Sequence, residues 1–156
     1  MDSKDNKVKS TGAILAEVEI PINAPKKVVW DTFANKTSEW WGKAFYASKK
    51  PAKFKIDLKL GGNMYEDTED GAGLIWFNIL GINEEEMIYV IGYTRPPFGG
   101  PATGLITFEF LKKGDNETIF KVSDATFGHV SEELIAGAEA GWTAIFSGLK
   151  NYVENN

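Results

Sequence analysis

The chain of 156 residues contains no cysteine and only one histidine, His129. The absence of cysteine excludes a disulfide framework, a thiolate nucleophile and thiolate zinc sites. The single histidine excludes a nitrogen-rich metal site, and the acidic residues lack metal-ligand spacing, so we expect neither a metal nor a cofactor. No Gly-rich phosphate loop, nucleophile elbow or paired-carboxylate motif is present either.

Long apolar runs are also missing. Residues 13–22 come nearest, but Glu17 and Glu19 interrupt them, which excludes a signal-peptide core and a membrane span. We therefore expect a cytoplasmic protein without membrane insertion. The net charge of −5 argues against nucleic acid as the partner. Residues 1–12 are polar and are expected to form a flexible tail before a single domain at residues 13–156.

Aromatic residues, by contrast, are abundant. They make up 13% of the chain and include five tryptophans. Such side chains are usually buried, so they must fill a core or surround a cavity.

The segment from Ser131 to Val153 has the clearest helical pattern. Ser131 can accept a hydrogen bond as the N-cap, and Glu132 and Glu133 lie in the first turn, where the helix dipole favours acids. Apolar residues recur at steps of three and four, which predicts one buried face. This face comprises Ile135, Ala138, Trp142, Ile145, Leu149 and Tyr152.

A stripe of small residues runs beside that face and includes Gly137, Gly141 and Gly148. Each glycine costs a helix about 1 kcal/mol relative to alanine, so another interaction should offset them. Two explanations remain open. Another backbone approaches the helix closely, or the helix is kept slim to leave room for a ligand.

The remaining elements predict an α+β domain. Residues 13–22 alternate as a strand, and two short helices follow, one from Pro25 to about Asn35 and one capped by Thr37. From Lys53 onward the apolar residues alternate with period two, with short turns between six further strands. Short turns indicate antiparallel pairing. We expect a curved antiparallel sheet of about seven strands covered by the C-terminal helix.

Two local patterns within the sheet lead to specific expectations. The acidic cluster from Glu66 to Asp70 precedes Gly71 and predicts a solvated hairpin turn, since it lacks the ligand pattern of a calcium loop. In the strand at residues 73–83, Ile75, Phe77 and Ile79 are expected to face inward. Trp76 and Leu80 then lie on the outer face, where they could contact a protein partner.

The order of several motifs resembles that of the START-like, or helix-grip (SRPBCC), superfamily. Within it, the chain is similar to the branch named after the activator of the ninety-kilodalton heat-shock chaperone's ATPase. The similarity extends from about residue 14 to 153. It rests on Pro25, Val29, Trp30, Trp40, Trp41, Phe54, Asp57, Gly61, Gly62, Asp70, Gly71, Thr118, Phe127, Gly128, Gly141, Trp142, Leu149 and Tyr152.

The resemblance implies a seven-stranded curved sheet that grips the C-terminal helix, with a cavity between them. Many members of the superfamily bind lipids, sterols, polyketides or other apolar molecules there, and some are cyclases or hydrolases. The co-chaperone itself carries a separate N-terminal domain, in whose place this chain has only a short polar tail.

Strand alternation and the helix pattern together give a set of residues expected around such a cavity. Asp124 shares the parity of Phe120 and Val122, so its carboxylate should point inward and accept a hydrogen bond, or orient the polar end of a ligand. His129 is expected near the mouth, as a capping or surface residue or in an acid/base pair with Asp124. The complete set is Met64, Phe77, Phe98, Phe108, Phe110, Phe120, Asp124, His129, Trp142, Ile145 and Phe146.

Three functions remain open at this stage. The first is a module that binds an apolar small molecule, which needs an enclosed pocket. The second is an enzyme of the cyclase or hydrolase kind, which needs several convergent polar groups. The third is an interaction protein of the co-chaperone type, which needs an exposed apolar surface. We expect Trp142 to be buried beneath the helix in each case.

Overall fold

A computed structural model describes residues 11–156 of the chain. The first ten residues of the expected tail lie outside this range. The helices and strands, in chain order, are β1 (Gly12–Ile22), α1 (Lys26–Asn35), α2 (Thr37–Trp40), η1 (Lys43–Phe45), β2 (Lys53–Ile56), β3 (Asn63–Asp67), β4 (Gly73–Asn83), β5 (Met87–Thr94), η2 (Pro96–Phe98), β6 (Ala102–Gly114), β7 (Glu117–Gly128) and α3 (Glu132–Asn155).

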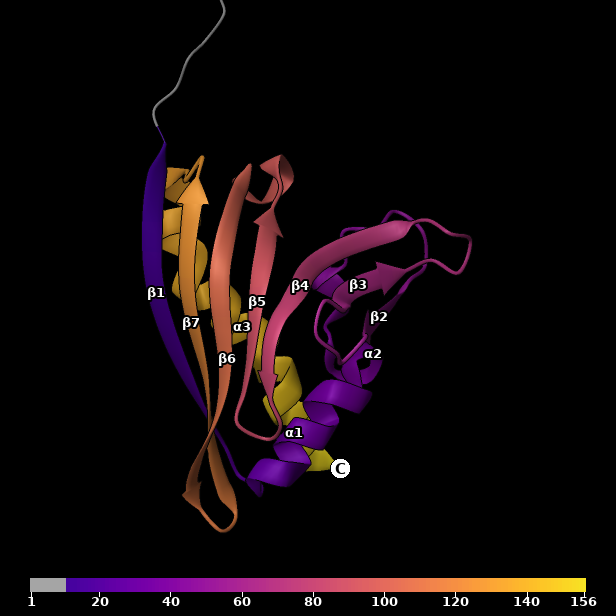
Figure 1. Cartoon of the computed structure of the whole chain (residues 1–156), viewed down its shortest axis with the longest axis vertical. Coiled ribbons are helices and arrows are strands. Elements are labelled where there is room, and N and C mark those ends of the chain that lie inside the picture. Colours follow the sequence, from indigo (N-terminus) through magenta and orange to yellow (C-terminus); the bar gives the residue numbers. More distant parts are fainter. Residues whose placement is uncertain (1–10) are drawn as a thin grey trace, which may run out of the picture.

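The seven strands form one antiparallel sheet in the order β1-β7-β6-β5-β4-β3-β2. The sheet curves around α3, which lies across its concave face (Figure 1). Both α1 and α2 follow β1 directly and lie near the C-terminal half of α3. The fold class expected from the sequence, an α+β helix-grip with about seven strands, is therefore confirmed.

The long helix begins as its sequence predicts. The hydroxyl of Ser131 accepts a hydrogen bond from the backbone N–H of Leu134 at 3.1 Å, which satisfies one of the free donors at the helix start. Phe146, Leu149 and Val153 are buried in the second half of the helix. The expectation that Ile135 is buried is wrong, because its side chain is 57% exposed. In the first turns Leu134, one step around the helix, faces the sheet side instead.

An aromatic cluster fills the half of the interior that lies beside α1. Phe33 of α1 is fully buried, and its ring centroid lies 5.5 Å from that of Phe110 and 5.8 Å from that of Phe120. The rings of Phe120 and Phe146 are closer still, at 4.6 Å. This half is a closely packed core in which the side chains of α1, α3 and the sheet interdigitate.

The second short helix starts differently from the expectation. Its N-cap position is Lys36, and no side chain caps it there. The hydroxyl of Thr37 instead donates to the carbonyl of Phe33 at 2.9 Å. Thr37 is therefore buried and ties α2 to α1 rather than capping α2.

Strand β4 departs from simple alternation at Trp76. Met64 of β3 pairs with Phe77, whereas the next residue, Tyr65, pairs with Ile75. Trp76 is therefore the extra residue of a β-bulge, which reverses the direction of the side chains before it. Ile75 is 47% exposed, so its expected inward position is wrong. Trp76 packs against the core, so the expectation that it lies on an outer surface is also wrong.

The acidic segment is only partly a solvated turn. Glu66 and Asp67 belong to β3, and the turn itself follows, with Glu69 and Gly71 at positive φ of 66° and 83°. The Glu66 side chain is fully buried. The expectation of a solvated Glu66 is wrong because β3 continues up to Asp67, and its alternation turns Glu66 inward.

Candidate functional site

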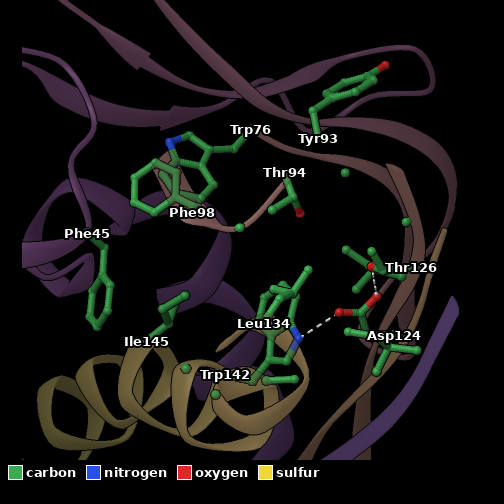
Figure 2. Close-up of a pocket in the computed structure, with 18 of the residues that line it drawn as sticks. Phe45, Trp76, Tyr93, Thr94, Phe98, Asp124, Thr126, Leu134, Trp142 and Ile145 are labelled. Atoms are coloured by element: carbon green, nitrogen blue, oxygen red, sulfur yellow. Dashed lines mark hydrogen bonds between the residues drawn. The ribbon is translucent and has the colours of Figure 1, made fainter. Parts of the chain in front are cut away.

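A pocket of about 420 Å³ lies between the sheet and the first half of α3. Its walls come from β1, from β4 to β7, from the η2 loop and from the helix, and one residue of η1 closes a side (Figure 2). Most of the exposed wall area is apolar. The larger side chains that line it are Phe45, Trp76, Phe77, Phe98, Leu134, Trp142 and Ile145.

The sequence left two explanations for the glycines of α3, close approach of another backbone or room for a ligand, and each explanation holds for some of them. Gly137 and Gly141 line the pocket, and a Cβ atom at either position would meet no atom within 4 Å. A Cβ at Gly148 would lie 2.4 Å from the carbonyl oxygen of Trp40. Gly148 thus permits the close approach of another backbone, whereas the other two leave room for the pocket.

The main polar group in the pocket is the carboxylate of Asp124 on β7. It accepts a hydrogen bond from the Trp142 indole N–H at 2.9 Å and one from the Thr126 hydroxyl at 2.6 Å (Figure 2). Gly104 on the neighbouring strand provides the space beside this pair, because a Cβ there would lie 2.5 Å from the Thr126 hydroxyl oxygen. The carboxylate is therefore held in one orientation by two neutral donors.

The η2 loop forms the outer wall of the pocket. The ring of Phe98 lies 5.6 Å from that of Trp76 between centroids, and Phe98 remains 43% exposed. Gly99 follows in the left-handed conformation, with φ of 98°. A Cβ at Gly99 would lie 2.9 Å from the hydroxyl of Ser131, so the loop packs closely on the start of α3.

Buried Glu66 holds one of the pocket walls in place. Its carboxylate accepts hydrogen bonds from the backbone N–H groups of Ala47 and Ser48, each at 2.7 Å, and from the Trp76 indole N–H at 2.8 Å. Burial alone raises the pKa of the Glu66 carboxyl, but these donors outweigh it and the pKa lies below its usual value. Glu66 thereby fixes both the segment after η1 and the Trp76 ring.

Five of the residues expected around a cavity line this pocket. They are Phe77, Phe98, Asp124, Trp142 and Ile145. Trp142 is only partly buried, which corrects the expectation that it is enclosed beneath the helix. Its ring packs on the core, 5.8 Å from the ring of Phe146 between centroids, and also borders the pocket.

The other apolar residues of the expected set do not line the pocket. They lie in the closed core, which the ring of Phe33 from α1 fills. Strand parity, and the helical period for Phe146, correctly placed them in the interior, but neither pattern could show where along the sheet the helices cover it. These residues are Met64, Phe108, Phe110, Phe120 and Phe146.

The single histidine lies outside the pocket. His129 is exposed after the end of β7, and its backbone N–H donates to the carbonyl of Pro101 at 2.9 Å. Asp124 is bonded to Thr126 and Trp142 instead. His129 is therefore a surface residue, which was one of the alternatives expected; it does not line the pocket, and the structure shows no Asp124–His129 pair.

Sequence reasoning missed several residues of the pocket. Trp76 was assigned to the outer face because alternation assumes an unbroken strand, and the bulge has no clear sequence signature. Phe45 comes from η1, whose path across the sheet depends on tertiary packing. Thr94 ends β5, and its hydroxyl points into the pocket, whereas the ring of Tyr93 points away and its hydroxyl donates to Asn78 (Figure 2).

Two kinds of feature are absent from residues 11–156. These residues contain no group of three or more His, Asp or Glu side chains that could hold a metal ion. They also contain no helix long and apolar enough to cross a membrane.

Comparisons with known proteins agree on the fold. A family model described as "Activator of Hsp90 ATPase homolog 1-like protein" matches residues 23–154. None of the curated proteins matches the chain. A structure of a conserved protein of unknown function from Enterococcus faecalis aligns with a TM-score of 0.64 and 17% identity, over 90% of this chain and 71% of that one.

Two further structures carry more descriptive names. Norcoclaurine synthase from Thalictrum flavum, solved in complex with dopamine and hydroxybenzaldehyde, aligns with a TM-score of 0.61 and 11% identity, over 99% of this chain and 98% of that one. Ara h 8.0201 aligns with a TM-score of 0.66 and 17% identity, over 93% of this chain and 100% of that one. At these identities the likeness concerns the fold alone.

Proposed function

Because the chain belongs to the Activator of Hsp90 ATPase homolog 1-like protein family and has an apolar pocket between sheet and helix, we propose that it binds an apolar small molecule there. The ligand class is aromatic, lipid-like or polyketide-like. The observation that carries the proposal is the pocket itself, with its aromatic walls and the carboxylate of Asp124 held by Trp142.

The size and chemistry of the pocket support this function. Small-molecule sites typically have about 300–1,000 Å³ and apolar walls with a few fixed polar groups. The pocket has about 420 Å³, and Asp124 is fixed by its two donors. Gly137 and Gly141 keep the helix side open at a cost in helix propensity. A helix that only had to cover the sheet would gain stability from larger residues at both positions.

The likeness to norcoclaurine synthase adds support of a weaker kind. That structure contains dopamine and hydroxybenzaldehyde, which shows that this fold can hold aromatic molecules. It supports the class of ligand proposed for this chain and leaves its identity to experiment.

Filling the pocket tests the proposal. Native mass spectrometry of the purified protein reports any ligand that co-purifies, and titration with naphthalene methanol measures binding directly. Gly141→Leu places a side chain in the pocket, because Gly141 lines it and no atom blocks the Cβ position. We expect this variant to fold and to lose binding. The matched control is Gly114→Leu, at the end of β6, where a Cβ also meets nothing within 4 Å, and it should bind like the wild type.

The opposite outcome would refute the proposal. If folded Gly141→Leu bound the probe as tightly as the wild type, binding would occur elsewhere on the protein. If no ligand co-purified and the wild type bound no apolar probe, the proposed ligand-binding function would be refuted.

A further inference from the structure

We propose that the pocket selects ligands whose polar end is a protonated amine, and that it rejects ligands with a carboxylate. This inference rests on the function proposed above. Among residues 11–156, the charged side chains that line the pocket are Asp124 and Glu133, and no lysine, arginine or histidine of this range lines it. An apolar acid such as a fatty acid would meet like charge, whereas an amine would meet opposite charge.

Asp124 carries the argument because its charge is not neutralised by its neighbours. Its two hydrogen-bond donors, Trp142 and Thr126, are both uncharged. Within residues 11–156, no salt bridge includes Asp124 or Glu133. A carboxylate has about four lone-pair sites, and two of them are used, so the oxygens can still accept from a ligand.

The pocket walls favour a cation for a second reason. Trp76, Trp142 and Phe98 all border the same space (Figure 2). The face of an aromatic ring, of tryptophan above all, attracts a cation within about 6 Å. Because the indole N–H of Trp142 is held by Asp124, ring and carboxylate lie side by side. An ammonium group could therefore contact a ring face and the carboxylate together.

The start of α3 does not reverse this preference. A helix N-terminus favours anions through its dipole and its free N–H groups. Here the Ser131 hydroxyl already accepts from the N–H of Leu134, and Glu132 and Glu133 place two acids in the first turn. Glu133 also lines the pocket, so the helix start contributes negative charge to the site.

A matched ligand series tests the inference on the full-length protein. Naphthalene methylamine, naphthalene methanol and naphthoate share one apolar body and differ in their polar end. Calorimetric titration at pH 7 and low salt should rank them amine, alcohol, carboxylate, with about tenfold between neighbours. Equal affinities, or tighter binding of naphthoate, would overturn the inference while leaving the proposed function intact. If none of the three bound, the proposed function would fail instead.

Asp124→Asn identifies the residue responsible. The amide keeps the size of the side chain and can still accept from Trp142, but it removes the charge. We expect the amine to lose about tenfold in affinity and the alcohol to change by less than about threefold. The matched control is Asp115→Asn, which removes the same charge from a side chain that is 93% exposed, and it should change neither affinity. Should Asp124→Asn fail to fold, the ligand series on the wild type still decides.

Discussion

At the scale of single residues, the same amino acid has opposite roles at different positions of α3. Gly141 faces open space and Gly148 faces the backbone of Trp40, although both lie on one stripe of the helix. Helix periodicity identified the stripe but could not separate the two roles, because they depend on what approaches the helix from elsewhere in the chain. Glu66 presents the same difficulty, since its three donors come from the segment at residues 47–48 and from Trp76.

The two glycines should respond oppositely to alanine. Gly141→Ala gains helix propensity without a clash, so we expect the free energy of unfolding to rise by about 1 kcal/mol. Gly148→Ala places a Cβ 2.4 Å from the Trp40 carbonyl oxygen. Overpacking of this kind should cost about 1–3 kcal/mol. Chemical denaturation measures the change in unfolding free energy of each variant. Changes of the same sign would contradict the different roles assigned to the two glycines.

Replacement of Glu66 by glutamine should destabilise the fold in a pH-dependent way. Glutamine loses the charge that the two amides and the Trp76 indole contact, which should cost roughly 2–3 kcal/mol near neutral pH. The folded-state pKa of Glu66 lies below its unfolded value of 4.5. The contribution of the charge is therefore present above about pH 4.5 and is lost as the pH falls through the folded pKa.

Denaturation of the wild type and Glu66→Gln between pH 7 and pH 3 tests this dependence. The difference in unfolding free energy should be constant down to about pH 5 and should shrink below it. The fully exposed Asp115, replaced by asparagine, provides a control with the same loss of charge. A difference that stayed constant at low pH would mean that the Glu66 charge contributes nothing.

At the scale of elements, the sequence predicts most of the helices and strands but less of how their side chains are oriented in the fold. The strand at Gly12–Ile22 and the helix from Glu132 appear where alternation and the 3.6-residue period predict them. The bulge at Trp76 could not be predicted from the sequence of β4. It is a shift in how β4 pairs with β3, and the residues of β4 alone do not reveal that shift. It alone moves a tryptophan from the outer face into the pocket wall.

The start of α3 offers a prediction at this scale. Ser131→Ala removes the acceptor for the Leu134 N–H, and we expect a loss of about 1 kcal/mol in unfolding free energy. Ser131→Asn keeps a capping side chain and should stay within a few tenths of the wild type. Since this turn also borders the pocket, hydrogen exchange of the first-turn amides should rise in the alanine variant alone. Equal stability of the two variants would show that the cap has no role.

At the scale of the whole molecule, the interior has two unlike halves. Beside α1 the aromatic rings interdigitate around Phe33, and toward η2 the same sheet and helix line a pocket that is partly open to solvent. Phe77 and Ile145 mark the pocket half, where five of the eleven expected site residues lie. The division could not be predicted from strand parity, because it depends on how far α1 extends beneath the sheet.

Truncating one phenylalanine from each half should separate stability from binding. Phe33 is fully buried among aromatic rings, so Phe33→Ala should lower the free energy of unfolding by about 3–5 kcal/mol. Phe98 is 43% exposed at the pocket wall, so Phe98→Ala should cost less than about 1 kcal/mol. The second variant should nevertheless bind naphthalene methanol more weakly, with a less negative heat-capacity change because less apolar area is buried. Unchanged binding by Phe98→Ala would exclude the η2 loop from the site. A small loss of stability in Phe33→Ala would contradict the close packing of the core around Phe33.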